Sequence, residues 1–252
     1  MTIEQALLLL SASVLAGALN SVAGGGSFIS FPMLIFIGIP SINANATNTA
    51  ALWPGSIASA FAYREELKTE IQTLLAYSVV SIIGGLLGAI LLLYTPNKVF
   101  DYILPYLLLV ATMLFALGKP ITKVLQKNRQ SKVAKKEYIG SIVAQLLIAI
   151  YGGFFGGGIG ILMLAVLSVM GMENIHKMNA VKTLLATWIN GIAVATFVFA
   201  RAIVWPQAIL MIAGAIVGGY LGATYARRLN PSLVRNFVTF TGFAMAIYFF
   251  LK

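Results

Sequence analysis

The chain of 252 residues contains no cysteine, one histidine and only seven acidic residues. Without cysteine it can form no disulfide, no thiolate nucleophile and no cysteine-ligated metal site. One histidine is too few for the usual ligand set of a zinc or haem enzyme. The sequence also lacks the Gly-x-Ser-x-Gly turn of serine hydrolases and the glycine–lysine loop that binds nucleotide phosphates. We therefore expect no metal, no cofactor, no ATP hydrolysis and no enzymatic activity.

The few acidic residues are confined to the ends of apolar segments. They are Glu4, Glu65, Glu66, Glu70, Asp101, Glu137 and Glu173. A proton relay or an acidic cation site inside a membrane normally has a carboxylate near mid-membrane depth. The sequence offers no carrier for either.

Apolar residues dominate what is present, at 60% of the chain, and the mean hydropathy is +0.92. A soluble domain cannot hide that much apolar surface from water. Apolar blocks lie near residues 4–23, 26–39, 43–62, 71–94 and 98–118, and again near 138–155, 158–171, 179–200, 206–226 and 231–251. Most are about 20 residues long, enough to cross a ~30 Å hydrocarbon core. The pattern predicts an all-α, polytopic transmembrane bundle with 8–10 membrane segments, whose first apolar run is a retained span.

Positive charge is concentrated in one connection. The formal net charge is +10, and seven of the 17 basic residues fall within residues 119–136. A basic connection between apolar blocks is typical of a cytoplasmic loop. This explains the charge without a nucleic-acid partner, which we do not expect, because positive charge alone carries no sequence readout.

The two halves of the chain are diverged copies of one unit. Residues 84–89, Gly-Gly-Leu-Leu-Gly-Ala, return as residues 218–223, Gly-Gly-Tyr-Leu-Gly-Ala, and the glycine triplet of residues 24–26 returns as residues 156–158. We therefore divide the chain into a first transmembrane repeat (1–118), a basic cytoplasmic linker (119–137) and a second transmembrane repeat (138–252).

The glycine triplets decide the predicted orientation of the repeats. Segments 26–39 and 158–171 would reach only about 21 Å as helices, too short to span, so each is expected to form a glycine-rich hairpin or a re-entrant segment. Each half then has odd parity, the second repeat is inverted, and both termini face the periplasm. With four crossings per half both repeats would instead point the same way. Inversion places four basic residues on the cytoplasmic side, and the alternative places only two there. Because cytoplasmic loops carry an excess of basic residues, this difference favours inversion.

The glycine triplets are also the first candidates for a binding site. A glycine turn that opens a helix presents unpaired backbone N–H groups and a positive dipole end, which together attract an anion. The candidate residues of the two turns are Gly24, Gly25, Gly26 and Ser27, and Gly156, Gly157 and Gly158. The alternative is that these glycines only allow close helix packing.

Polar residues that open the following span in each repeat are the second candidates. They are Asn45, Thr47 and Asn48 in the first repeat and Lys182 and Thr183 in the second. Amides and hydroxyls can replace part of an anion's hydration shell, and a buried lysine would be its counter-charge. Helix capping and interhelical hydrogen bonds are the alternatives for the polar residues, and snorkelling of the side chain is the alternative for Lys182.

These residues resemble the signatures of one family. The run Asn-Ser-Val-Ala-Gly-Gly-Gly-Ser at residues 20–27, followed by Pro32, is similar to the first signature of the TauE/SafE membrane proteins, and residues 152–158 are similar to the second. The Ala-x-x-Thr pairs Ala44/Thr47 and Ala180/Thr183 match a duplicated element of the family. Two departures are Leu164, where the second signature would carry the proline, and Lys182 within the second pair. The resemblance implies an anion permease of the bacterial inner membrane, with sulfite and organosulfonates such as sulfoacetate as the leading substrates.

From the residues and the resemblance together we expect a transporter of a small anion that works by alternating access without ATP. The sulfite, thiosulfate and sulfoacetate class is the expected substrate, and lipid is the expected solvent. An anion channel, and a membrane assembly factor or enzyme without a recognisable catalytic pair, stay open as alternatives, as does homo-oligomerisation.

Overall fold

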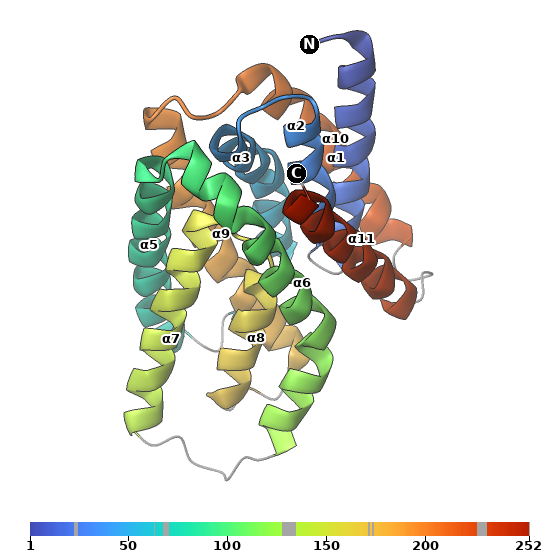
Figure 1. The fold of residues 1–252 in the computed structure, drawn as a ribbon. Coiled ribbons are helices and arrows are strands. Elements are labelled where there is room, and N and C mark those ends of the chain that lie inside the picture. Colours follow the sequence, from blue (N-terminus) through green and yellow to red (C-terminus); the bar gives the residue numbers. More distant parts are fainter. Residues whose placement is uncertain are drawn as a thin grey trace.

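The computed structural model spans residues 1–252 and describes all of them except 23–24, 63, 68–70, 128–134, 171, 173, 226–230 and 252. The described residues form helices and no strand, which confirms the all-α prediction (Figure 1). The helices of the first half are α1 (Ile3–Val22), α2 (Ser27–Phe36), α3 (Ser41–Ala62), α4 (Arg64–Leu67), α5 (Ile71–Tyr94) and α6 (Asn97–Lys127). Those of the second half are α7 (Lys135–Phe154), α8 (Ile159–Val169), α9 (Ile175–Phe199), α10 (Trp205–Tyr225) and α11 (Pro231–Leu251).

The basic connection is less of a loop than the sequence suggests. Helix α6 continues through residues 119–127, and α7 already begins at Lys135. Residues 119–127 and 135–137 of the predicted linker are therefore helical. Lysine, glutamine and leucine are good helix formers, so the helices run on past the apolar blocks.

Four helical stretches of the described residues are long and apolar enough to cross a membrane. They are Ile3–Asn20, Leu74–Tyr94, Asn97–Leu117 and Lys177–Phe199. Shorter apolar stretches lie in α2, α7, α8, α10 and α11. Large apolar side chains such as Leu91, Phe199 and Phe240 are exposed on the outside of the bundle, as expected where lipid is the solvent.

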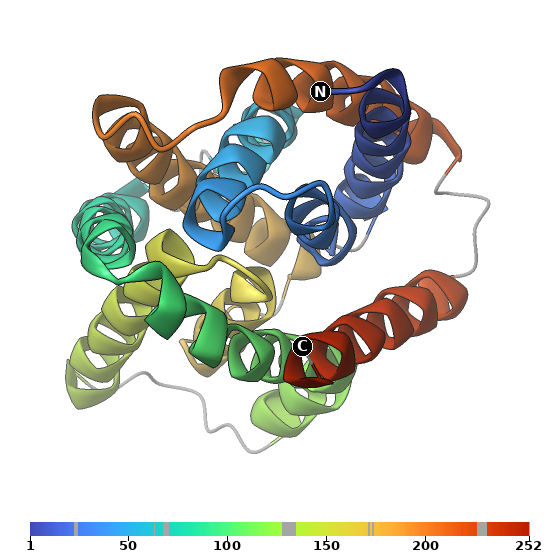
Figure 2. The same ribbon diagram turned by 45° about the horizontal axis from the view of Figure 1, so that its top comes forward.

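Helices α2 and α8 are half-length. They contain 10 and 11 residues, about 15–17 Å of helix, well short of a ~30 Å core. Each follows a turn that contains the predicted glycines. Seen from the upper end of the bundle, α2 lies inside it, between α1, α3 and α11 (Figure 2). These two helices are the discontinuous segments expected from the sequence.

The two halves exchange packing partners. Helix α1 packs along α10, and its counterpart α7 packs along α5, while α3 crosses α9 and α6 crosses α11. Small residues make the first two contacts close. A Cβ at Gly218 would collide with the backbone of Val14, and one at Gly84 would lie 2.9 Å from the carbonyl oxygen of Leu146. Gly84 and Gly218 are therefore packing residues, at which only a glycine allows this approach of the helices.

Buried hydrogen bonds add to the contact between α5 and α7. The hydroxyls of Tyr77 and Ser141 lie 2.6 Å apart, and one turn further along, Gln145 Nε2 donates to Ser81 Oγ at 2.9 Å. Such bonds between helices in a membrane contribute about 0.6 kcal/mol each on average. Because they recur at a spacing of four residues on both helices, they fix the register of the pair.

Matching helices of the two halves run in opposite directions. Helix α1 starts at the upper end of the bundle and runs down, whereas α7 starts at the lower end and runs up (Figure 1). The chain therefore starts at the end opposite the connection between α6 and α7. An inverted pair of repeats requires this arrangement, and inversion across a membrane stays a prediction.

Candidate functional site

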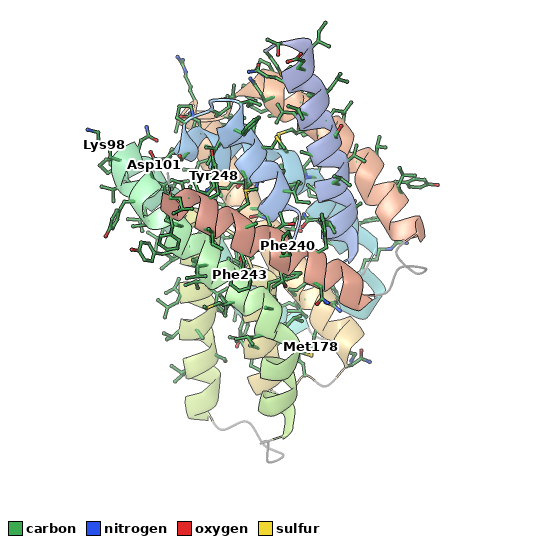
Figure 3. The ribbon with its side chains drawn as sticks, turned by 45° about the vertical axis from the view of Figure 1, so that its right-hand side comes forward. Lys98, Asp101, Met178, Phe240, Phe243 and Tyr248 are labelled. Atoms are coloured by element: carbon green, nitrogen blue, oxygen red, sulfur yellow. The ribbon has the colours of Figure 1, made fainter. Side chains whose placement is uncertain are left out.

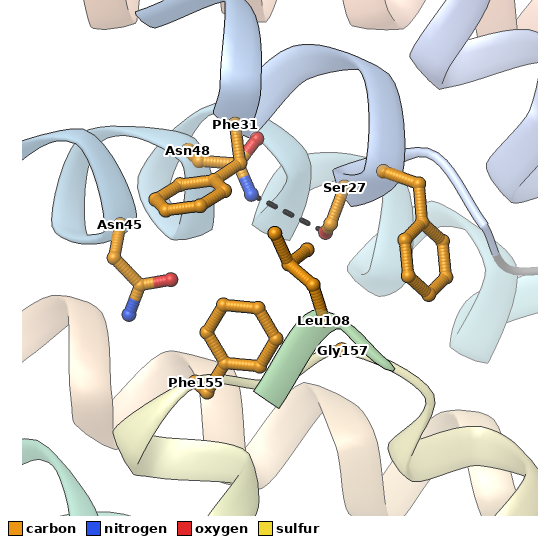
Figure 4. A pocket seen from close by; sticks show the side chains of 8 residues that line it. Ser27, Phe31, Asn45, Asn48, Leu108, Phe155 and Gly157 are labelled. Atoms are coloured by element: carbon orange, nitrogen blue, oxygen red, sulfur yellow. Dashed lines mark hydrogen bonds between the residues drawn. The ribbon is translucent and has the colours of Figure 1, made fainter. Parts of the chain in front are cut away.

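A small pocket lies where the two glycine turns meet. It is lined by Ser27, Phe28, Phe31, Asn45, Asn48, Leu108, Phe155 and Gly157 (Figure 4). These residues come from α2, α3, α6 and the turn between α7 and α8, and so from both halves of the chain. The pocket has room for about one water molecule.

The first glycine turn is held by hydrogen bonds within the first half. Gly26 N–H donates to Asn20 Oδ1 at 3.3 Å, and Gly25 carbonyl oxygen accepts from Phe28 N–H at 3.2 Å. Gly26 has an ordinary helical φ of −59°. A Cβ at Gly26 would collide with the carbonyl of Ala16 on α1. Gly25 and Gly26 are therefore glycines because neighbouring helices approach closely, and the Gly26 N–H is not free for an anion.

The second glycine turn uses the left-handed backbone region. Gly156 has φ +81° and Gly158 has φ +75°, whereas Gly157 between them does not have a positive φ. Left-handed backbone is therefore required at Gly156 and Gly158 and not at Gly157. Gly157 carbonyl oxygen accepts a hydrogen bond from Tyr151 OH at 2.8 Å. Its N–H has no acceptor among the described residues, and it stands at the N-terminal end of α8 beside the pocket.

Amide and hydroxyl groups form the polar wall of the pocket. Asn48 Nδ2 donates to Ser27 Oγ at 3.2 Å, and Ser30 Oγ donates to Asn48 Oδ1 at 2.5 Å. Asn45, on the same face of α3, is 2% exposed and donates through Nδ2 to the carbonyl oxygen of Phe154 at 3.0 Å. None of the described residues that line the pocket carries a charge.

Aromatic rings form the opposite wall. Phe31 of α2 and Phe155 of the turn before α8 meet edge to face, with centroids 5.8 Å apart and an interplanar angle of 88°. Phe28 packs in the same way on Phe115 of α6 at 6.1 Å. The rings close the pocket from both halves of the chain.

Four of the predicted site residues line the pocket, namely Ser27, Asn45, Asn48 and Gly157, whereas Gly25, Gly26, Gly156, Gly158, Thr47, Lys182 and Thr183 do not. Thr47 is fully buried, and its Oγ1 accepts from Val204 N–H at 3.0 Å, which holds the connection between α9 and α10 against α3. Thr183 and Lys182 do not line the pocket. Lys182 Nζ donates to Asn179 Oδ1 at 3.0 Å, and its aliphatic chain passes close to Gly160 at the start of α8. Gly24 lies outside the described residues.

The aromatic wall was not predicted. Phe155 stands beside the second glycine triplet, and Phe28 and Phe31 follow the first, so their positions in the sequence could have suggested them. Leu108 lies in the middle of an apolar helix, and nothing in the sequence distinguishes it. Within the part of the chain that the structure describes, no three histidine, aspartate or glutamate side chains lie together as a metal site would require.

A comparison with known families shows to which family the chain belongs. The sequence model of the family described as sulfite exporter TauE/SafE matches residues 9–249. The chain belongs to the TauE/SafE family.

Membrane transporter proteins are among the relatives of this TauE/SafE protein. The "Probable membrane transporter protein ORF9" of Sinorhizobium sp is 28% identical over 237 residues, which cover 94% of this chain and 88% of the relative. The "Probable membrane transporter protein" of Haemophilus influenzae is 26% identical over 96% of this chain and 93% of its own length. The "Probable membrane transporter protein YfcA" of Escherichia coli K12 is 25% identical over 93% and 85%. No solved structure matches the chain. Family and helices together make this a multi-pass membrane protein of a transporter family.

Proposed function

We propose that this TauE/SafE protein transports a small anion, sulfite or an organosulfonate, by alternating access without ATP. One observation carries the proposal: Ser27, the first residue of α2, and Gly157, in the turn before α8, line the same pocket. The N-terminal ends of both half-length helices therefore converge on one small volume inside the bundle.

Two converging helix N-termini favour negative charge. Each carries the equivalent of about half a positive charge. Ser27 Oγ accepts from Asn48 Nδ2 and keeps its own O–H to donate, and the Gly157 N–H is a second donor beside the pocket. Since none of the described residues that line the pocket carries a full positive charge, an anion would be held weakly enough to leave again, as transport requires.

The closed pocket favours alternating access over a channel. An anion with several oxygen atoms needs more room than one water molecule, so the Phe31 and Phe155 rings would have to separate before it could enter. These rings belong to opposite halves of the chain, and a relative movement of the halves would part them. No observation favours the assembly-factor or enzyme alternative.

The proposed placement is the bacterial inner membrane, with the connection between α6 and α7 in the cytoplasm. The basic residues of that connection and the opposite directions of α1 and α7 support this placement.

A flux assay tests the proposal. Purified protein in liposomes would be assayed with sulfite, thiosulfate, sulfoacetate, sulfate and chloride. We expect saturable flux of sulfite or a sulfonate that is stimulated by the same anion on the opposite side. Flux that neither saturates nor responds to the opposite anion would indicate a channel, and no flux of any of the five would contradict the proposal.

A further inference from the structure

Asn45 presents an acceptor, rather than a donor, to the candidate anion pocket. Its side chain is almost fully buried and lines the pocket. One end of its amide is held by the carbonyl oxygen of Phe154 at 3.0 Å. The other end has no hydrogen-bond partner among the described residues and points toward the space between the Phe31 and Phe155 rings (Figure 4).

The orientation of this amide follows from chemistry. A carbonyl oxygen can only accept a hydrogen bond, so the atom facing Phe154 must be the NH2 group of Asn45. The atom left at the pocket is then Oδ1, which has two lone pairs and no hydrogen. A flipped amide would place two acceptors against each other and leave the NH2 group in an aromatic surrounding.

An acceptor within an anion site is informative because it opposes the charge of the ligand. An anion oxygen facing Oδ1 would meet another lone pair, and a buried acceptor left without a donor carries a desolvation penalty. A ligand that carries its own N–H or O–H avoids both costs. A site built to hydrogen-bond a ligand hydroxyl discriminates strongly against an analogue that lacks the hydroxyl. This discrimination is larger than that of an apolar pocket between ligands that differ by one methylene group.

We propose that Asn45 selects, among small anions, those that carry their own hydrogen-bond donor. This rests on the proposed function, because it assumes that the pocket binds the transported anion. The selected class comprises sulfonates with a hydroxyl or amino group and singly protonated oxyanions such as hydrogen sulfite. Fully deprotonated oxyanions and halides fall outside it. Asn45 is thus a specificity-determining residue, while Ser27 and Gly157 provide the donors for the negative charge.

Matched anions that differ by one donor test the proposal. Calorimetric titration of the purified protein would compare isethionate with ethanesulfonate and hydrogen phosphate with sulfate, and would follow sulfite binding as the pH is lowered. We expect the donor-bearing member to bind roughly tenfold more tightly, the effect of one unmade hydrogen bond at a buried acceptor. In Asn45→Leu the ratio of the two affinities should fall to about one. If that variant does not fold, Asn45→Ala serves in its place.

Ser27→Ala is the matched control, since it removes a donor from the opposite side of the polar wall. The variant should lower the affinity for both anions of a pair equally and leave the ratio of the two affinities unchanged. Equal binding of both members by the unchanged protein, or a preference for the donor-free member, would overturn the role of Asn45 while leaving the anion site intact. If no member of any pair binds, the proposed function fails as well.

Discussion

The three consecutive glycines of the second turn meet two different demands. Gly156 and Gly158 adopt a backbone conformation that costs other residues about 1–2 kcal/mol. Gly157 has no such requirement, but a Cβ there would lie 2.8 Å from the Phe155 ring and 3.2 Å from Ala111. Only at Gly157 would a new methyl group push directly against the pocket rather than strain the turn.

Gly157→Ala should therefore weaken anion binding in a protein that still folds. The new methyl group meets side chains rather than backbone, and the nearest is the Phe155 ring, which would have to shift and which lines the pocket. Overpacking of about 1–2 kcal/mol corresponds to a five- to thirtyfold loss of affinity, measured by titration of detergent-purified protein.

Gly140→Ala on α7 is the control for that variant, because a Cβ there has open space around it. Its affinity and melting temperature should match or exceed those of the unchanged protein. If Gly157→Ala binds normally and melts early, the glycine turn is a packing device and not part of a site.

Which polar residues reach the pocket follows from helical spacing. Asn45 and Asn48 are three residues apart, share a face of α3 and both line the pocket. Thr47 is two residues from Asn45, which places it on another face, where it bonds to Val204. The sequence identified the polar cluster, but it could not tell which face of α3 would meet the turn before α8, because that contact joins residues more than 100 positions apart.

At the scale of elements, the positions of the helices could be predicted from the sequence, but their packing partners could not. The apolar blocks predicted the long helices within a few residues, except that α6 continues to Lys127, and the short α4 had no apolar block. Apolar length is a strong signal in a membrane protein. The exchange of partners between α1 and α10 and between α5 and α7 could not be predicted in the same way, since repeats that pack within themselves would have the same sequence pattern.

Neighbouring glycines on α10 test the role of this close packing. Gly218→Ala should lower yield and melting temperature, with a cost of about 1–3 kcal/mol, because its Cβ would meet the backbone of Val14, which cannot rotate away. Gly219→Ala should be harmless, since the nearest atom to its Cβ is the carbonyl oxygen of Gly17 at 3.9 Å. Thermal melts of both variants give the comparison, and anion affinity should be unchanged in each. A loss of affinity in folded Gly218→Ala would connect this contact to the site.

At the scale of the molecule, inversion of the repeats makes a topological prediction. The absence of cysteine allows single cysteines to be introduced one at a time. The N-terminus and Lys98 lie at the same end of the bundle (Figures 1 and 3). Cysteines introduced as Thr2→Cys and Lys98→Cys should both be labelled from the periplasmic side by a membrane-impermeant reagent. A cysteine within residues 119–136 should be labelled only from the cytoplasm. Cytoplasmic labelling at position 2 would contradict the inversion.

The scarcity of acidic residues makes a second prediction for the whole molecule. Asp101 is exposed near the start of α6, where its Oδ1 accepts a hydrogen bond from Ser41 Oγ, and Glu4 is exposed in the first turn of α1. Glu4→Gln or Asp101→Asn should leave transport in liposomes within a few-fold of the unchanged rate, because neither carboxylate lies near the pocket. Complete loss of flux from either change, in a protein with a normal melting temperature, would show that coupling passes through that carboxylate.

The exchange of packing partners also sets the order in which the protein can be completed during translation. Helix α5 can pair with α7 as soon as Phe154 has been synthesised, but α1 must wait in the membrane until α10, which begins at Trp205. Throughout that interval the backbone beside Gly17 faces lipid or a chance neighbour. A nascent chain released before α10 is made therefore keeps an open small-residue surface on its first helix. Premature termination should produce chains that are recognised for degradation even though most of their helices are inserted.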